Sequence, residues 1–201
     1  MKEFKHKIQT LICCTLLFGF GLNMHKAEAQ LLIVDQSNQV GGLTTLGTMI
    51  PGQSLGQSFK PSLTGIDWFK IQGSSVGVST VRLSLLSGTN MAGISLATTT
   101  PIQMTNVTLQ PIEFRFPSTV SLNPGAFYTA RLDLLAGDSY KLEFSFSNPY
   151  SRGFAFDESY TAVPSVDLVF AEGLVSVPEP SVVAITGGSI LAFLLRRKKS
   201  V

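Results

Sequence analysis

Short apolar or alternating segments recur along most of this 201-residue chain. Residues 112–116 alternate apolar and charged side chains strictly. A period of two places successive side chains on opposite faces of a strand, so we expect Phe114 and Phe116 to face inward and Arg115 to face solvent. No segment of residues 30–177 keeps an apolar stripe at helical spacing across three turns. The body of the chain therefore predicts β-structure.

The same pattern divides the body into short strands. They are expected at residues 66–71, 80–86, 93–98, 102–109, 112–116, 127–135, 140–146, 154–156 and 166–171. Turn signals separate them, and several short strands without alternating helices are typical of two packed antiparallel sheets. We predict an all-β fold, an antiparallel β-sandwich of jelly-roll kind, over residues 55–172. Residues 30–54 should form a loosely ordered approach with at most one edge strand.

The N-terminus has the three parts of a secretory signal peptide. Lysines open the chain, residues 11–22 are apolar, and Ala27 and Ala29 form an A-x-A cleavage site. This order predicts that residues 1–29 are removed and that the mature chain begins at Gln30. An uncleaved N-terminal anchor is the alternative.

The C-terminus, residues 173–201, combines a linker, a stiff motif, an apolar segment and a basic end. The motif consists of Val177, Pro178, Glu179, Pro180 and Ser181. Its two prolines fix φ, remove backbone donors and favour an extended peptide. Residues 182–195 carry no charge, but as a helix they would span about 21 Å, short of the roughly 30 Å hydrocarbon core. The basic end, which should stay in the cytoplasm, consists of Arg196, Arg197, Lys198 and Lys199.

This order of motif, membrane segment and basic stop resembles the bacterial PEP-CTERM sorting signal. The match covers residues 177–201. The resemblance implies that an exosortase, a membrane protease-transpeptidase, recognises the motif and removes the tail. It also implies export, a transient hold in the inner membrane, and delivery to the cell surface or to an exopolysaccharide or biofilm matrix. A plain single-span membrane anchor is the alternative.

The placement of cysteine and histidine limits the chemistry. His6, Cys13, Cys14 and His25 all lie in the expected signal peptide. The mature body therefore lacks the residues for a disulfide, a thiol nucleophile, an imidazole base or a Cys/His zinc site. Its ten acidic and seven basic residues give a net charge of −3, which does not predict nucleic acid as a partner. We predict a non-enzymatic protein without cofactor or metal.

Carboxylates leave two alternatives open. A glycosidase needs two facing carboxyl groups, and Asp133 with Glu143 is one candidate pair. Their apolar neighbours predict that both lie on a solvated sheet face instead. Calcium is a further possibility, with Asp138, Asp157 and Glu158 as oxygen ligands, although no D-x-D-x-D spacing supports it.

The body is also similar to secreted bacterial sandwich domains that are distantly similar to carbohydrate-binding modules. The segments that carry this resemblance are residues 56–59, 66–71, 121–128 and 148–153. It implies a sandwich over about residues 55–171 and, as the alternative function, a lectin-like module of the exopolysaccharide layer. Exposed aromatic rings bind sugars through their faces, so Trp68, Tyr150 and Tyr160 are candidates. Arg152 shares a predicted loop with Tyr150, whereas Trp68 has a competing role in the core.

Overall fold

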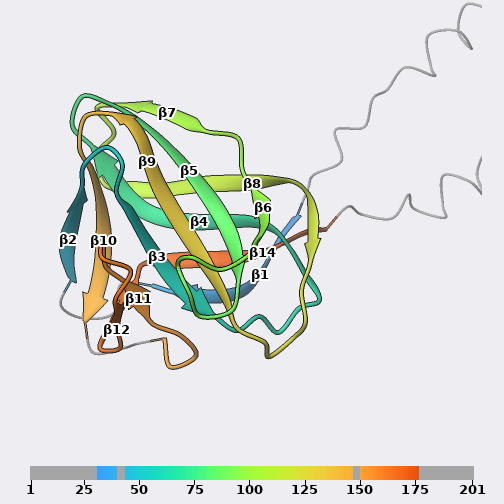
Figure 1. Cartoon of the computed structure of the whole chain (residues 1–201). Coiled ribbons are helices and arrows are strands. Elements are labelled where there is room, and N and C mark those ends of the chain that lie inside the picture. The colour runs from blue at the N-terminus through green and yellow to red at the C-terminus, as the bar shows by residue number, and fades with distance from the viewer. Residues whose placement is uncertain (1–30, 40–43, 147–149, 177–201) are drawn as a thin grey trace, which may run out of the picture. The chain divides into compact units, whose positions relative to one another are not determined.

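Fourteen β-strands and no helix make up the part of the chain that the computed structural model describes, residues 31–39, 44–146 and 150–176 (Figure 1). The strands are β1 (Leu31–Asn38), β2 (Thr44–Met49), β3 (Ser54–Phe59), β4 (Gly65–Ser75), β5 (Val78–Ser87), β6 (Ser95–Thr98), β7 (Ile102–Thr105), β8 (Gln110–Ser121), β9 (Tyr128–Gly137), β10 (Tyr140–Phe146), β11 (Ala155–Phe156), β12 (Ala162–Val163), β13 (Val166–Leu168) and β14 (Phe170–Ser176).

The strands form two antiparallel seven-stranded sheets. Sheet A has the order β1-β14-β4-β10-β13, with β2 also paired to β10 and β8 to β4. Sheet B has the order β12-β11-β3-β9-β5-β6, with β7 also paired to β5. This arrangement confirms the prediction of an all-β antiparallel sandwich.

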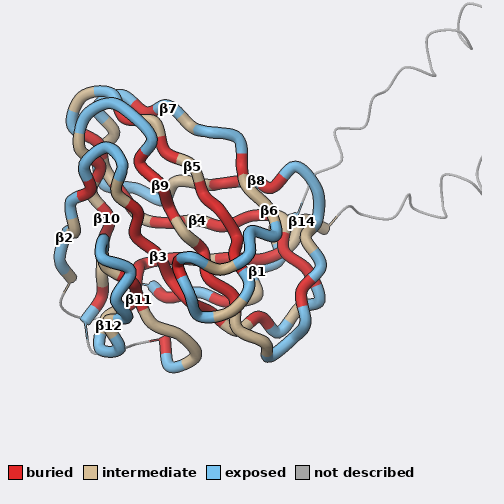
Figure 2. Tube along the Cα trace, in the orientation of Figure 1, coloured by how far each residue is buried: buried red, intermediate tan, exposed pale blue. Residues whose placement is uncertain are grey.

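The core lies between the sheets and takes one face of each strand. Buried positions run along the middle of β4, β5 and β9 (Figure 2). In β8, Phe114 is 0% and Phe116 7% exposed, while Arg115 is exposed. The prediction for this strand is therefore confirmed, because its period of two matches a strand with one buried face.

The pairing of β4 with β8 is irregular between Ile66 and Trp68. Ile66 pairs with Val120 and Trp68 with Arg115, so β8 has three more residues than β4 across this gap. Such an irregularity changes the inward and outward alternation of side chains. Ile66 and Phe69 both join the core cluster, and Trp68 does not.

The region before residue 55 is more ordered than its composition predicts. Strand β1 pairs with β14 over seven residue pairs, and β2 pairs with β10 over six. The prediction of a loosely ordered approach with at most one edge strand is therefore wrong. Glycine is a weak strand former in isolation, but pairing with a neighbouring strand overrides that preference, and the threonines of β2 favour a strand.

The C-terminal boundary also differs from the expected linker. Residues 173–176 belong to β14, where Leu174 and Val175 pair with Ile33 and Leu32 of β1. The expected strand at residues 166–171 is divided between β13, which pairs with β10, and β14, which pairs with β4. Regular structure therefore continues to Ser176, the residue before the Val177 motif.

No helix in the described ranges is long and apolar enough to cross a membrane. The expected signal peptide and the apolar segment at residues 182–195 lie outside those ranges.

We expect Phe114→Ala to lower the free energy of unfolding by about 3–5 kcal/mol, because it removes a fully buried ring and leaves a cavity. Arg115→Ala, one position along the same strand, should change it by less than about 0.5 kcal/mol. Urea unfolding followed by Trp68 fluorescence measures both. Equal urea midpoints for the two variants would contradict the assigned faces of β8.

Candidate functional site

The residues predicted to direct sorting and export lie outside the described residues. They are the cleavage residues Ala27, Ala29 and Gln30, the motif Val177, Pro178, Glu179, Pro180 and Ser181, and the basic end Arg196, Arg197, Lys198 and Lys199. Their roles remain predictions.

Tyr150 lies in the core rather than on an exposed loop. It is 6% exposed, and its ring packs edge-on against Phe170 with centroids 5.1 Å apart. Its hydroxyl accepts a hydrogen bond from the Lys60 backbone N–H at 3.1 Å. Burial raises the pKa of Tyr150 to about 12. The prediction that Tyr150 offers a ring face to a sugar is therefore wrong, because the sandwich already covers that ring.

Arg152, which was predicted to bind a sugar together with Tyr150, belongs to a cluster of polar side chains instead. Its guanidinium donates to Gln36 Oε1 and to Ser62 Oγ, both at 3.2 Å. Gln36 Nε2 in turn donates to Ser62 Oγ at 2.8 Å and to Asp35 Oδ1 at 3.0 Å. These residues come from β1, the β3–β4 loop and the segment before β11. With Glu172 of β14 they form what we call the Glu172 cluster: Asp35, Gln36, Ser62, Arg152 and Glu172.

Asp35 is oriented by a β-bulge in β1. The register between β1 and β14 shifts between Val34 and Gln36, which makes Asp35 the extra residue. Its Oδ2 accepts hydrogen bonds from the backbone N–H groups of Ser62 and Leu63 at 2.7 and 2.9 Å. The bulge thus directs a carboxylate onto the β3–β4 loop and fixes that loop against the first strand.

Glu172 is the most unusual member of the cluster. It is 0% exposed, and neither carboxylate oxygen receives a hydrogen bond within the described part of the chain. Burial and then the neighbouring Asp35 carboxylate raise the pKa of Glu172 to about 9, although Arg152 acts in the opposite direction. A buried carboxylate without a hydrogen-bond donor is unfavourable, so a bound proton or a bound cation would stabilise this side chain.

Sequence reasoning missed Asp35, Gln36, Ser62 and Glu172. A usable signal exists for Glu172, which shares the inward face of β14 with Phe170. A charged residue at an inward position of an alternating strand points to a special environment. The signal was lost because residues 173–176 looked like a linker, which ended the strand next to Glu172.

A second buried carboxyl group, that of Asp167, accepts a hydrogen bond on each of its two oxygens. Asp167 Oδ1 accepts from Gln57 Nε2 at 2.8 Å, and Oδ2 accepts from the Tyr150 backbone N–H at 3.1 Å. Burial raises the pKa of Asp167, and these two hydrogen bonds oppose the rise. Gln57 Oε1 also accepts from the Leu168 N–H at 2.7 Å. This network joins β3 to β13 and has a structural role.

Trp68 lies on the face of sheet A that points away from the core, yet it is 1% exposed. Its indole N–H donates to the Leu174 carbonyl at 3.0 Å, and the ring lies close to Gly173, where a Cβ would come within 3.0 Å of Cζ2. Lys70 Nζ lies 5.0 Å from the ring centroid. Trp68 is therefore neither an exposed ring that could bind a sugar nor a member of the core between the sheets. Its ring is buried by β14 and Lys70 instead.

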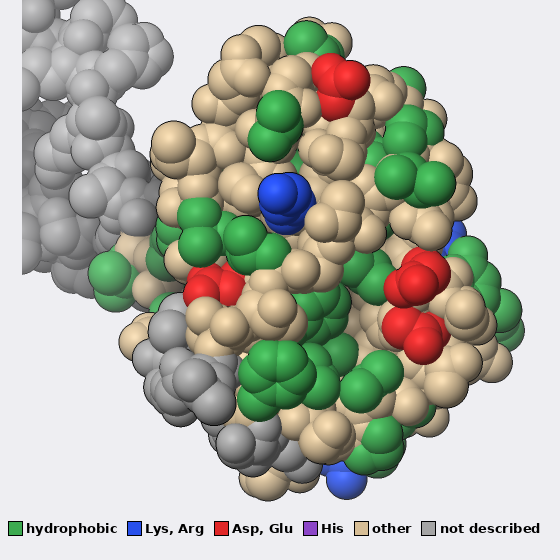
Figure 3. Space-filling view, turned by 90° about the vertical axis from the view of Figure 1, so that its left-hand side faces the viewer, with side chains coloured by type: hydrophobic (Ala, Val, Ile, Leu, Met, Phe, Trp, Pro, Cys, Tyr) green, Lys and Arg blue, Asp and Glu red, His purple; other side chains and the backbone are tan. Residues whose placement is uncertain are grey.

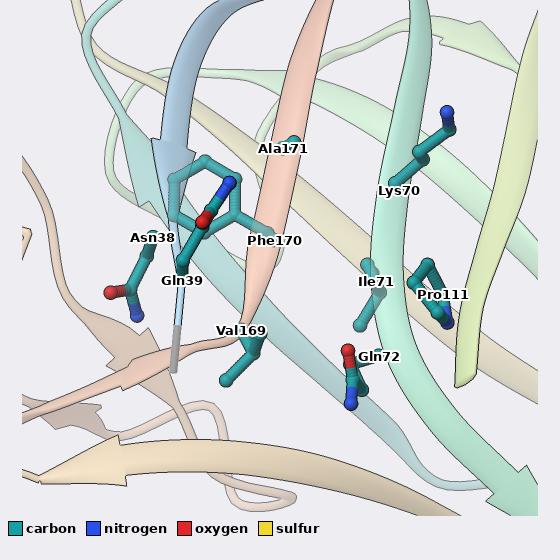
Figure 4. Close-up of a pocket in the computed structure, with 9 residues that line it drawn as sticks. All are labelled: Asn38, Gln39, Lys70, Ile71, Gln72, Pro111, Val169, Phe170 and Ala171. Carbon is teal, nitrogen blue, oxygen red and sulfur yellow. The ribbon is translucent and has the colours of Figure 1, made fainter. Parts of the chain in front are cut away.

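The outer face of sheet A bears a pocket of about 410 Å³ that both amide and apolar side chains line (Figure 4). Amide groups from Asn38, Gln39 and Gln72 and the ammonium of Lys70 surround it, while Pro111, Val169 and Ala171 supply apolar surface. We call it the amide pocket. Sequence reasoning missed it because its residues come from four separate segments.

Lys70 is held at the edge of the amide pocket by Glu113. Lys70 Nζ lies 2.9 Å from Glu113 Oε2, and Arg115 Nε lies 2.6 Å from Glu113 Oε1. Partial burial works against ionisation, but the two cations hold the pKa of Glu113 below its usual value. The ion pair therefore fixes the ammonium group of one of the residues that line the pocket.

Asp133 and Glu143 are buried rather than solvated, at 8% and 6% exposed, which corrects the prediction for both. Asp133 accepts from Ser54 Oγ at 2.7 Å and pairs with Arg82 and Arg131 at 3.3 and 2.9 Å. One arginine of the same strand and one of the neighbouring strand β5 thus cover a carboxylate on an outer face. The two acids belong to different sheets, since Asp133 is in β9 and Glu143 in β10.

The residues predicted as calcium ligands do not come together. Asp138 Oδ2 accepts from the Val78 N–H at 3.0 Å, whereas Asp157 Oδ1 accepts from the N–H groups of Ser159 and Thr161. No group of three or more His, Cys, Asp or Glu side chains suited to a metal occurs among the residues described. That interpretation of Asp138, Asp157 and Glu158 is wrong, because both aspartates serve their own turns.

A smaller hollow of about 170 Å³ lies between β2 and β10 of sheet A and β11 and β12 of sheet B. Gly47, Leu55, Phe144 and Val166 line it, with Asp157 and Glu158 among the remaining residues. Figure 3 views this side of the domain and shows hydrophobic side chains gathered between polar ones. Its few polar groups make it a weaker candidate for a hydroxyl-rich ligand than the amide pocket.

Comparison with known proteins gives little further guidance. No family model and no curated protein matches the chain. Among solved structures, the chain is similar to a carbohydrate-binding module, CBM36, in complex with calcium and xylotriose, with 12% identity and a TM-score of 0.32. The likeness covers 56% of this chain and 95% of that one. It carries no conclusion about a ligand here.

We expect Tyr150→Ala to lower the free energy of unfolding by about 3–5 kcal/mol, because a core ring is lost. Tyr150→Phe removes only the hydroxyl and should cost about 0.5–1.5 kcal/mol. Chemical unfolding of both variants tests this. An alanine variant as stable as the wild type would show that Tyr150 is exposed after all.

Proposed function

We propose that this protein is an exported, non-enzymatic β-sandwich that an exosortase sorts to the cell surface or extracellular matrix. The observation that carries the proposal is the tail itself: a Val-Pro-Glu-Pro-Ser motif, an uncharged segment at residues 182–195 and four basic residues. The expected signal peptide at residues 1–29 supports export.

The end of the fold is compatible with this use of the tail. Strand β14 ends at Ser176, and the motif begins at the next residue. An extended peptide that follows a paired strand directly is a suitable substrate for a protease that binds its substrate as a strand. The absence of cysteine and histidine from the sequence of residues 30–177 supports a role without thiol or imidazole catalysis.

A second candidate function, glycan binding, is favoured by the amide pocket. Side-chain amides donate and accept hydrogen bonds, as pairs of sugar hydroxyl groups require, and a Lys ammonium adds three donors. The apolar surface of Pro111, Val169 and Ala171 suits the C–H faces of a sugar ring. An exopolysaccharide of the layer to which the protein is sorted is the expected ligand class.

For the sorting function, we expect Glu179→Ala to leave export intact and to block removal of the tail, because Glu179 is the only charge in the motif. Mass spectrometry of the mature C-terminus in the native host, with and without its exosortase, measures this. Glu158→Ala, which changes an exposed acid of the domain, is the matched control. A wild-type surface protein that still ends at Val201 would show that the tail is a plain anchor.

For glycan binding, we expect Gln72→Ala to weaken binding to the host exopolysaccharide about tenfold, since two lost hydrogen bonds correspond to about 1–2 kcal/mol. Gln103→Ala, an exposed glutamine on β7 of the other sheet, should leave binding unchanged. Affinity electrophoresis of the surface protein tests both. Equal mobility of wild type and Gln72→Ala in the polysaccharide gel would remove the amide pocket as a binding site.

A further inference from the structure

The Glu172 cluster contains more carboxyl groups than cations. Two carboxyl groups, those of Asp35 and Glu172, share the junction of β1 and β14 with one guanidinium, that of Arg152. Both hydrogen bonds of Arg152 go to neutral oxygens, Gln36 Oε1 and Ser62 Oγ. Glu172 thus receives no direct hydrogen bond from the one cation that influences it.

Burial prevents water from stabilising the second carboxyl group. Glu172 is 0% exposed, so water cannot solvate its carboxylate. A buried ionised carboxyl group is stable only with a counter-charge and hydrogen bonds, or when it binds a proton. The Tyr150 hydroxyl accepts from the Lys60 N–H and makes no hydrogen bond to Glu172 among the described residues. A bound proton or a bound cation would therefore stabilise Glu172.

Beside the Arg152 guanidinium and the Gln36 amide nitrogen, the cluster offers several oxygen atoms of the kind that hard cations prefer. They comprise the carboxylates of Asp35 and Glu172, the amide oxygen of Gln36 and the hydroxyl of Ser62. Calcium accepts such mixed oxygen sets and completes its coordination with water, whereas zinc and copper favour nitrogen and sulfur ligands. Magnesium demands a stricter octahedral geometry.

We propose that the Glu172 cluster binds a calcium ion between the carboxylates of Glu172 and Asp35, with Gln36 and Ser62 as neutral oxygen ligands. Arg152 is half-buried and turns toward solvent when the ion enters. The ion would tie β1 to β14 and to the β3–β4 loop. Affinities of about 10⁻⁴–10⁻³ M are usual for extracellular calcium modules. The proposal is independent of the tail and of glycan binding.

Calcium titration of the full chain in detergent at pH 8 tests the site. Trp68 is the only tryptophan, so its fluorescence reports unfolding of the sandwich. We expect 10 mM calcium chloride to raise Tm by about 3–6 °C over EDTA at equal ionic strength. Isothermal titration should give one bound calcium per chain.

Two substitutions locate the ion. Glu172→Gln and Asp35→Asn keep side-chain shape but remove one negative charge each, and both should abolish the Tm shift and the binding heat. Glu158→Gln removes an exposed negative charge and should keep both. An unchanged Tm and no binding heat for the wild type would overturn the proposal, and Glu172 would then bind a proton only. A shift that survives Glu172→Gln would also overturn it.

Discussion

The sandwich depends on a cluster of aromatic rings that joins its two sheets. Phe69 of β4 stacks on Phe170 of β14 with centroids 5.3 Å apart, and its ring lies 5.6 Å from Phe59 of β3 in the opposite sheet. Tyr150 packs edge-on against Phe170. Aromatic rings bury large areas and prefer such stacked and tilted geometries. This group therefore sets the distance between the sheets and the position of every element that meets it.

The polar features follow from that arrangement. Because Tyr150 is fixed in the core, its backbone N–H meets Asp167, and Arg152, two residues later, reaches Gln36 and Ser62. Because Phe170 faces inward, Glu172 does so as well, on the same face of β14. The same hydrophobic packing that stabilises the sandwich thus carries a carboxylate into a place where water cannot reach it.

The period of two in the sequence is sufficient to predict the fold class and the buried face of β8. A strict alternation of apolar and charged residues, as in residues 112–116, identifies the buried face by itself. It failed where the register between paired strands shifts. The shifts between β4 and β8 and between β1 and β14 arise from strand pairing, which local sequence does not encode. Composition likewise gave a wrong prediction for β1 and β2, because these strands are ordered by their pairing with β14 and β10. The two polar sites join residues distant in the chain, so no spacing rule reveals them.

We propose that the tail delivers the sandwich to the outside of the cell and that the domain functions there. The sequence of residues 30–177 contains no cysteine, so Thr89→Cys in the exposed turn after β5 places one thiol in the mature chain. Labelling intact cells with a membrane-impermeant maleimide tests the claim most directly. The account predicts labelling without lysis, whereas labelling that appears only after lysis would contradict it.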